Sequence, residues 1–181
     1  MRDFDSRLWV PLALACAAAP VQATQYLTAE RAQRVLFPEA DSFAATPVRL
    51  TAELKSQLQA DGAGRVRGDE QPAWAASVSG AVVGHVLVDE VIGKHELITY
   101  AVGIGSDGAV RGVEILDYRE TRGGEVRDPR WRAQFVGKRR GAPLRLEQDI
   151  QNISGATLSC RHVTEGVRRL LALHALALKE K

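Results

Sequence analysis

Residues 149–159 read Asp-Ile-Gln-Asn-Ile-Ser-Gly-Ala-Thr-Leu-Ser and lead directly into a long segment with helical periodicity. The first amides of a helix lack intrahelical partners, and the helix dipole favours negative charge beside them. Gly155 and Ala156 add little bulk to this turn, so an anionic group such as a phosphate can approach the backbone near the hydroxyl of Thr157. A Ser/Thr-rich segment before an apolar run is also how ordinary helices are capped, and local chemistry alone favours capping.

The segment from Thr157 to Leu178 predicts one amphipathic helix. Its apolar residues recur at intervals of three and four and form one stripe, while three arginines are expected to face solvent. We expect Gly166, inside this helix, to mark a close approach to a sheet. The stripe consists of Val163, Val167, Leu170, Leu171, His174 and Leu178, and the outward residues are Arg161, Arg168 and Arg169.

Four segments before the helix are rich in β-branched and aromatic residues and are separated by turn signals. They predict a half-buried antiparallel sheet, and Asp107-Gly108 is a good hairpin signal. Gly103, Gly105 and Gly108 also match the dinucleotide-binding pattern Gly-x-Gly-x-x-Gly, but a strand follows where that motif needs a helix, so we interpret them as hairpin residues. The predicted strands are 74–78, 82–91, 97–104 and 110–118, and alternation puts Ile98, Tyr100, Val102 and Ile104 on one face.

Residues 24–72 predict a helical lead-in that precedes the sheet. Thr28 and Thr51 predict helix starts, and we expect the two short helices that follow them to cover one side of the sheet. From Arg119 to Arg145 the sequence becomes rich in Gly, Pro and charge, which predicts a long basic loop. The fold class is therefore α+β, with short N-terminal helices, an antiparallel sheet of about four strands, a long basic loop and a C-terminal amphipathic helix packed on the sheet.

The N-terminal region predicts export. Residues 8–19 form a short apolar run behind Arg2 and Arg7, and a small-residue cleavage pattern follows at 20–23. This is typical of a secretory signal peptide over residues 1–23, and the run is too short to span a bilayer. A retained N-terminal anchor is the alternative.

The composition is compatible with a single exported domain. If Cys16 leaves with the signal peptide, Cys160 is the only cysteine left, so no intramolecular disulfide is possible. The formal net charge of +2 argues neither for nor against nucleic acid, whereas export argues against it. We expect a periplasmic protein, soluble or peripheral at the inner membrane, that binds no nucleic acid.

The sequence shows no pattern for a metal site, a haem or a nucleophilic catalyst. None of the histidines lies at metal-ligand spacing, and no Cys-x-x-Cys-His, P-loop or Gly-x-Ser-x-Gly occurs. His174 lies in the apolar stripe, where we expect a satisfied core histidine. We therefore assign no metal ligand and no catalytic residue.

Ser-Gly-Ala-Thr-Leu-Ser at residues 154–159 resembles the signature of the FMN-binding domain family. That family includes the C subunit of the sodium-pumping NADH:quinone oxidoreductase and the G subunit of the Rnf electron-transport complex. The resemblance implies that FMN is attached covalently through its phosphate to Thr157 as phosphothreonyl-FMN. It also implies an FAD-dependent flavin transferase that makes this bond and releases AMP.

A second match lies upstream, and the resemblance covers roughly residues 80 to 175. Residues 118–124 look like the family's Glu-Thr-Pro-Gly-Leu-Gly turn, and residues 131–138 look like its aromatic-Gln-Phe-x-Gly-Lys segment. Gln151 stands where the family usually has Asp, and Asp149 lies two positions further upstream. In the turn, three residues replace the usual Pro, Leu and final Gly, namely Arg122, Gly124 and Glu125.

The resemblance implies a flavin site around these two matches, within an FMN-binding domain at residues 73–181. Trp131 and Phe135 lie four residues apart, and they either give the flavin ring an apolar wall or tuck the loop onto the core. Glycine in the turn permits close backbone approach to the ring. The expected cofactor-binding residues are Thr157, Ser154, Gly155, Ala156, Leu158, Ser159, Glu120, Thr121, Gly123, Trp131 and Phe135.

The implied function is that of an exported electron-transfer flavoprotein that exchanges electrons with a membrane-bound redox protein. Two alternatives stay open. One is a flavin-free accessory module of a membrane redox complex, which the Gln151 departure favours. The other is a small reductase that acts directly on an extracytoplasmic acceptor, for which the sequence shows no substrate motif.

Overall fold

The computed structural model describes residues 24–62, 66–120 and 123–179. The predicted signal peptide at 1–23 and the candidate residue Thr121 lie outside the described residues. None of the helices in the described ranges is long and apolar enough to cross a bilayer.

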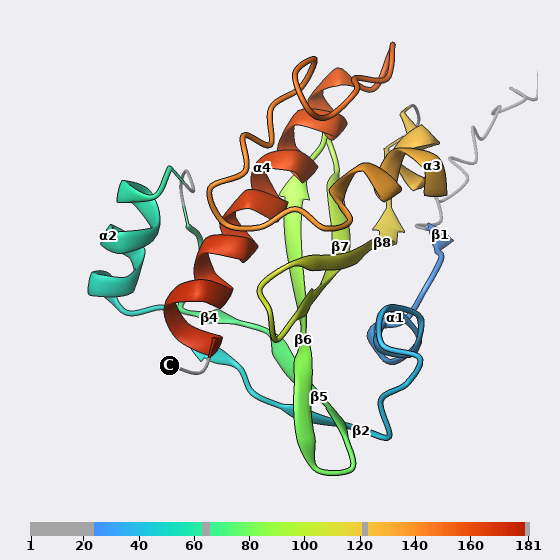
Figure 1. The fold of residues 1–181 in the computed structure, drawn as a ribbon. Coiled ribbons are helices and arrows are strands. Elements are labelled where there is room, and N and C mark those ends of the chain that lie inside the picture. The colour runs from blue at the N-terminus through green and yellow to red at the C-terminus, as the bar shows by residue number, and fades with distance from the viewer. Residues whose placement is uncertain (1–23, 63–65, 121–122, 180–181) are drawn as a thin grey trace, which may run out of the picture.

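Six antiparallel strands form one sheet in the order β1-β8-β7-β6-β5-β2 (Figure 1). The four central strands are the four that the sequence predicts, and the lead-in adds an edge strand at each side of them. A separate two-stranded pair joins β3 to β4. The bounds are β1 Thr24–Gln25, β2 Ser42–Ala45, β3 Val48–Arg49, β4 Glu70–Gln71, β5 Ala73–Val78, β6 Ala81–Ile92, β7 Leu97–Gly105 and β8 Val110–Tyr118.

Tight turns connect the long strands. Ser79 and Gly80 both have positive φ between β5 and β6, as a two-residue type I′ hairpin requires. Between β7 and β8, Gly108 has a φ of +85° and the amide of Gly105 donates to the carbonyl of Ala109 at 2.9 Å. The predicted hairpin interpretation of the glycine pattern is therefore confirmed.

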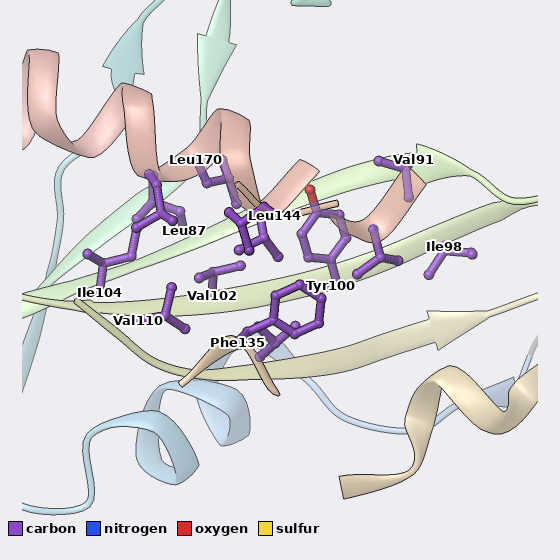
Figure 2. Packing of buried hydrophobic residues seen from close by; sticks show 14 of the residues in the cluster. Leu87, Val91, Ile98, Tyr100, Val102, Ile104, Val110, Phe135, Leu144 and Leu170 are labelled. Carbon is purple, nitrogen blue, oxygen red and sulfur yellow. The ribbon is translucent and has the colours of Figure 1, made fainter. Parts of the chain in front are cut away.

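The sheet carries a helix on each face, which corrects the expectation of a half-buried sheet. Helix α4 (Thr157–Leu173) packs on one face, and helix α1 (Ala29–Leu36) packs on the other. Strand β7 shows this arrangement, because Tyr100 and Val102 belong to the α4-side cluster (Figure 2). Ala101, which lies between them in the strand, belongs to the α1-side cluster. All three side chains are completely buried.

The two lead-in helices do not share one side of the sheet, contrary to the prediction. Helix α2 (Ala52–Ala60) lies beside α4, with Leu58 buried in the α4-side cluster (Figure 1). Helix α1 packs closely on the opposite face because glycines leave that face without side chains beneath Leu36. A Cβ on Gly103 would lie 3.0 Å from Leu36 Cβ, and a Cβ on Gly112 would lie 2.8 Å from Leu36 Cδ2. The division between a lead-in at 24–72 and a domain at 73–181 stays a prediction.

The C-terminal helix follows the prediction closely, except at two of its three arginines. Helix α4 continues into a π-helical turn, η3 (His174–Leu178), so the helical segment spans the predicted 157–178. Arg161 is exposed as expected, but Arg168 is only partly exposed and its Nε is buried. Arg169 instead forms an ion pair with Asp89 of β6, with both side chains less than a fifth exposed. Asp89 also accepts a hydrogen bond from the hydroxyl of Tyr100 at 2.9 Å.

The segment 119–145 is more ordered than the predicted loop. It contains η1 (Gly124–Arg127), α3 (Pro129–Arg132) and η2 (Ala133–Phe135). The side chain of Asp128 accepts the amide of Arg130 at 2.8 Å, and Pro129 occupies the first helical position. An Asp-Pro pair is an N-cap followed by the residue favoured at the first helical position, so the start of α3 was visible in the sequence.

His174 lies in the core as predicted, but it is paired with a second histidine. Its Nε2 lies 3.3 Å from Nδ1 of His85, and its own Nδ1 is buried without a hydrogen-bond partner among the described residues. Burial, and then the neighbouring His85, lower the pKa of His174 to about 4. The folded protein therefore keeps this ring neutral well below the ordinary pKa of histidine.

We expect Gly166→Ala to destabilise the protein, because a Cβ there would lie 1.9 Å from the buried hydroxyl oxygen of Tyr100. Overpacking of this kind costs about 1–3 kcal/mol, measurable as a lower midpoint in urea unfolding. Glu165→Ala, at the exposed neighbouring position, is the control and should change stability little. Adding Tyr100→Phe to Gly166→Ala should cost less than the sum of the two single changes; simple additivity would contradict the contact.

We also expect acid to destabilise the protein between pH 6.5 and about 4 through His174. The folded pKa lies below the unfolded one, so the unfolded state binds more protons in that window and stability falls as pH falls. The loss approaches about 3 kcal/mol near pH 4. Urea unfolding across this range should show a shallower loss in His174→Leu, whereas exposed His95→Gln should match wild type. Equal slopes in wild type and His174→Leu would contradict this origin.

Candidate functional site

Helix α4 begins without a side-chain cap. Its N-cap residue is Ala156, whereas α1 and α2 are capped by the hydroxyls of Thr28 and Thr51, which accept backbone amides at 3.3 and 3.2 Å. The turn before α4 is made by Gly155, whose φ is +83°. The ordinary capping role that the sequence favoured on local grounds is therefore absent here. The first-turn amides of α4 have no side-chain acceptor and remain available to an external anion.

The Thr157 hydroxyl is half-buried and held by one neighbour. Its Oγ1 accepts a hydrogen bond from Nδ2 of Asn152 at 3.1 Å. The other amide atom, Asn152 Oδ1, is buried without a partner among the described residues. Sequence reasoning missed Asn152, although its position inside the motif, five residues before Thr157, made it visible. The Thr157 hydroxyl is thus oriented by the neutral amide of Asn152, whose oxygen has no hydrogen-bond partner among the described residues.

Two hollows meet at Ser154 and Gly155. The first, which we call the β8-side hollow, has a volume of about 860 Å³, within the range of small-molecule sites. The second, the loop-side hollow, has a volume of about 500 Å³ and reaches Thr157. The β8-side hollow is lined by Tyr26, Tyr118, Glu120, Gly123, Glu125 and Arg127, and the loop-side hollow by Glu147, Gln151, Asn152 and Thr157.

The structure brings the two matched segments together. A Cβ on Gly123, where φ is +85°, would lie 2.7 Å from the Tyr118 hydroxyl and 3.1 Å from Cβ of Ala156. The Tyr118 hydroxyl lies 3.3 Å from Oγ of Ser159, and burial raises the pKa of Tyr118. The glycine in the turn therefore allows the backbone after β8 to pack against the start of α4, as the predicted close approach requires.

Glu120 lines the β8-side hollow, and one of its carboxylate oxygens accepts backbone hydrogen bonds that stabilise the fold. Its Oε1 accepts the amide of Glu96 at 3.0 Å and the amide of His95. Burial opposes ionisation, but these backbone hydrogen bonds outweigh it and lower the pKa of Glu120. The carboxylate is therefore ionised at neutral pH and ties the end of β8 to the β6–β7 turn.

Trp131 and Phe135 build the core below the motif. Trp131 is 5% exposed and Phe135 is completely buried, and their rings meet edge to face at 5.2 Å. Trp131 Nε1 donates to the carbonyl of Gln151 at 2.7 Å, and the amide of Gln151 donates to Oε1 of Gln134 at 2.7 Å. Trp131 and Gln134 therefore hold the backbone of Gln151 in place. The other interpretation, an apolar wall for a ligand, has no exposed ring face to support it.

The remaining candidate residues divide between the surface and the interior. Ser154 and Gly155 are exposed, and Leu158 is 39% exposed beside them. Ala156 and Ser159 are 4% exposed each, so they shape the start of the helix from inside. Among the described residues, no three His, Cys, Asp or Glu side chains group as a metal site would require.

The acidic residues near the motif have different roles. Asp149 accepts hydrogen bonds from Lys138 Nζ at 2.9 Å and from the amides of Leu144 and Arg145, which hold its pKa low despite burial. Asp149 therefore stabilises the loop, and it is not among the residues that line the loop-side hollow. The carboxylate that lines the loop-side hollow with Gln151 is that of Glu147.

A pair that sequence reasoning missed lines the β8-side hollow. The guanidinium of Arg127 lies over the ring of Tyr26, 4.1 Å from its centroid. Tyr26 follows β1, which pairs with the end of β8 through Gln25 and Asp117. No local pattern marks a tyrosine in the lead-in as a site residue, because its position depends on this long-range strand pairing.

Comparisons with known proteins agree with this geometry. Residues 93–172 match the family model of the FMN-binding domain. The chain is 26% identical over 186 residues to the G subunit of the Na⁺-translocating ferredoxin:NAD⁺ oxidoreductase complex of Acetobacterium woodii, covering 88% of this chain and 86% of the relative. It is 38% identical over 79 residues to the C subunit of the Na⁺-translocating NADH-quinone reductase of Vibrio vulnificus, covering 34% of this chain and 31% of that protein.

The fold is also found in a solved structure. The crystal structure of Shewanella oneidensis NqrC aligns with a TM-score of 0.53 at 19% identity, covering 75% of this chain and 80% of the other. At that identity the likeness concerns the fold. The family match spans both the turn after β8 and the uncapped start of α4. Through residues 93–172, this chain is therefore similar to the FMN-binding domain family.

Proposed function

We propose that this protein carries FMN bonded through its phosphate to the hydroxyl oxygen of Thr157 and passes electrons to or from a membrane-bound redox protein. The observation that carries the proposal is the start of α4, where uncapped amides and the half-buried Thr157 hydroxyl lie together between two hollows. The names of the relatives support it, because both are subunits of Na⁺-translocating oxidoreductases. The signal-peptide pattern at 1–23 supports a periplasmic location.

The residues present fit a phosphate and a large planar ring. The first-turn amides of α4 would donate to phosphate oxygens, and a Cβ at Gly155 would meet nothing within 4 Å, so the approach is open. Asn152 Oδ1 is a buried acceptor without a partner among the described residues, and it would accept a hydrogen bond from a ligand hydroxyl, not from the phosphate. The β8-side hollow begins at Ser154 and Gly155, with Tyr26 as an aromatic side chain at its wall.

The attachment requires only one nucleophile from this chain. The Thr157 oxygen would form a phosphoester with the FMN phosphorus of FAD, the bond to AMP would break, and the hydroxyl proton would pass to the transferase or solvent. Asn152 Nδ2 donates to Oγ1 and therefore leaves the hydroxyl proton free to depart. No base from this chain accepts a hydrogen bond from that hydroxyl in the described residues, which agrees with a reaction catalysed by a separate flavin transferase.

Bound FMN supplies reversible one- and two-electron chemistry, and the protein supplies position and exposure. The tether has a physical reason, since a flavin that dissociates outside the cytoplasm would not easily be regained. Among the described residues, the side chains that line the β8-side hollow include two tyrosines, Arg127 and several carboxylates, and they form no acid–base pair arranged on a substrate. We therefore infer a carrier of electrons between partners.

Thr157→Ala should abolish covalent flavin. The full-length protein is co-expressed with a flavin transferase, denatured in SDS and examined for a fluorescent band. Wild type should fluoresce and gain the mass of FMN less water, whereas Thr157→Ala should do neither. Thr157→Ser should keep at least part of the band because the nucleophilic oxygen is preserved. An unlabelled wild type would favour the flavin-free accessory module, and a labelled Thr157→Ala would move the tether elsewhere.

Asn152→Ala should slow flavin incorporation without preventing it. Loss of the 3.1 Å hydrogen bond releases the Thr157 hydroxyl from its orientation, and a bond worth about 1 kcal/mol corresponds to a roughly fivefold slower reaction. The initial rate of fluorescence gain under purified transferase measures the effect. Exposed Gln148→Ala is the matched control and should react as wild type does. Equal rates for the two variants would remove Asn152 from the site.

A further inference from the structure

A third hollow, which we call the arginine hollow, lies away from Thr157 along α4. It has a volume of about 540 Å³ and is bounded by the C-terminal part of α4, the loop 139–145 and the end of α2. Arg168 lies eleven residues after Thr157, so about 16 Å of helix separates it from the start of α4. Four arginines and one carboxylate line it, namely Arg139, Arg140, Arg145, Arg168 and Asp61.

Arg168 is the unusual member of this set. Its Nε is buried and has no hydrogen-bond partner among the described residues. The next residue, Arg169, has the opposite situation, because it is paired with Asp89. A buried donor without a partner costs about 1–3 kcal/mol, and more when the group is charged, so such a group in a native fold requires an explanation.

The acids near the arginine hollow are already engaged. Asp61 accepts two hydrogen bonds from Arg140, each at 2.8 Å, and these lower the pKa of Asp61. Arg139 is paired with Asp107 on the β7–β8 turn. Arg145 and Arg168 have no carboxylate partner in the described part of the chain. Two positive charges are therefore left uncompensated at one concave surface.

The floor and the rim suit a compact anion. Leu144 and Leu171 are 2% exposed each and give the hollow an apolar base, where charge interactions are stronger than in water. Gly62 and Gly141 have positive φ and no atom within 4 Å of an added Cβ, so the rim is open. Guanidinium groups match the geometry of phosphate oxygens and bind them through paired hydrogen bonds.

We propose that the arginine hollow is a phosphate-binding site that is independent of the start of α4, with Arg168 and Arg145 as its main charged contacts. The group bound is a phosphate or phosphodiester anion. It is supplied either by a soluble molecule or by the headgroup of an anionic lipid, and both sources present the same oxygens to the same two arginines.

The test is a titration of the ¹⁵N-labelled full-length protein with inorganic phosphate at constant ionic strength. We expect amide shifts at Gly62, Gly141 and Ala142, next to the hollow. Arg168→Met should weaken the binding measured at these amides at least tenfold. Arg161→Met removes an exposed arginine from the same helix outside the hollow and should leave the binding unchanged. Shifts confined to residues 155–159 would report only the start of α4 and would overturn the proposal.

Vesicle sedimentation distinguishes the two sources. Binding to phosphatidylglycerol vesicles but not phosphatidylcholine vesicles, lost in Arg168→Met and kept in Arg161→Met, identifies a lipid headgroup. Arg168-dependent shifts with inorganic phosphate and no vesicle binding identify a soluble ligand. If Arg168→Met matches Arg161→Met in both assays, the site does not exist. Flavin labelling of Thr157 is measured separately, so failure of one proposal leaves the other intact.

Thermal unfolding separates binding from folding. Removing an unpaired, partly buried charge is expected to leave the Tm of Arg168→Met unchanged or to raise it, because no native partner is lost. A lowered Tm together with lost phosphate binding would show that Arg168 supports the fold, and would overturn its role as a ligand contact.

Discussion

The contact between Gly166 and Tyr100 determines where the rest of the C-terminal half lies. The missing side chain at Gly166 lets α4 come down onto the tyrosine hydroxyl, and Asp89 binds that hydroxyl from β6. Arg169, three residues further along α4, completes the arrangement by pairing with the same carboxylate. A helix held this close at its middle has little freedom at its ends. Its first turn is therefore delivered to a fixed place beside Tyr118 and Gly123.

The first turn of α4 lacks the side-chain N-cap that stabilises helices α1 and α2. Thr28 and Thr51 cap α1 and α2, and an N-cap of this type contributes roughly 1 kcal/mol. Helix α4 has Ser154 and Thr157 close at hand, yet its N-cap is Ala156 and neither hydroxyl caps it. The missing cap is consistent with first-turn amides that bind an external anion, since a side-chain cap would compete with that anion for the same amides. Packing of ten buried residues along α4 compensates for the missing cap.

Local signals predicted local structure well. Threonine caps marked α1 and α2, Asp107-Gly108 marked a hairpin, and Gly166 marked the approach of helix to sheet, because each depends on residues close in the chain. The prediction was wrong where a distant partner decides the outcome. Arg169 was expected to face solvent, since a helical pattern contains no information about Asp89 on β6.

The candidate site shows the same division. The turn and the motif were recognisable as segments, and the structure brings Gly123 against Ala156. Tyr26 was not foreseeable, because only the pairing of β1 with β8 carries it to the hollow. Trp131 and Phe135 were identified as important while their role was left open, since an aromatic pair has the same spacing whether it packs inward or meets a ligand.

The two proposed sites on α4 would meet an anion by two different physical means. At Thr157 the proposed phosphate would be met by backbone amides and a helix dipole, which need no basic side chain and leave the hydroxyl neutral. Eleven residues later the backbone amides are all consumed within the helix, so only side chains can meet an anion, and there the chain places Arg168. The uncapped turn is compatible with a covalent bond to the ligand, because the electrostatic attraction of a helix N-terminus alone is too weak to retain one. The arginine hollow suits reversible binding that salt can weaken, because its attraction is between full charges.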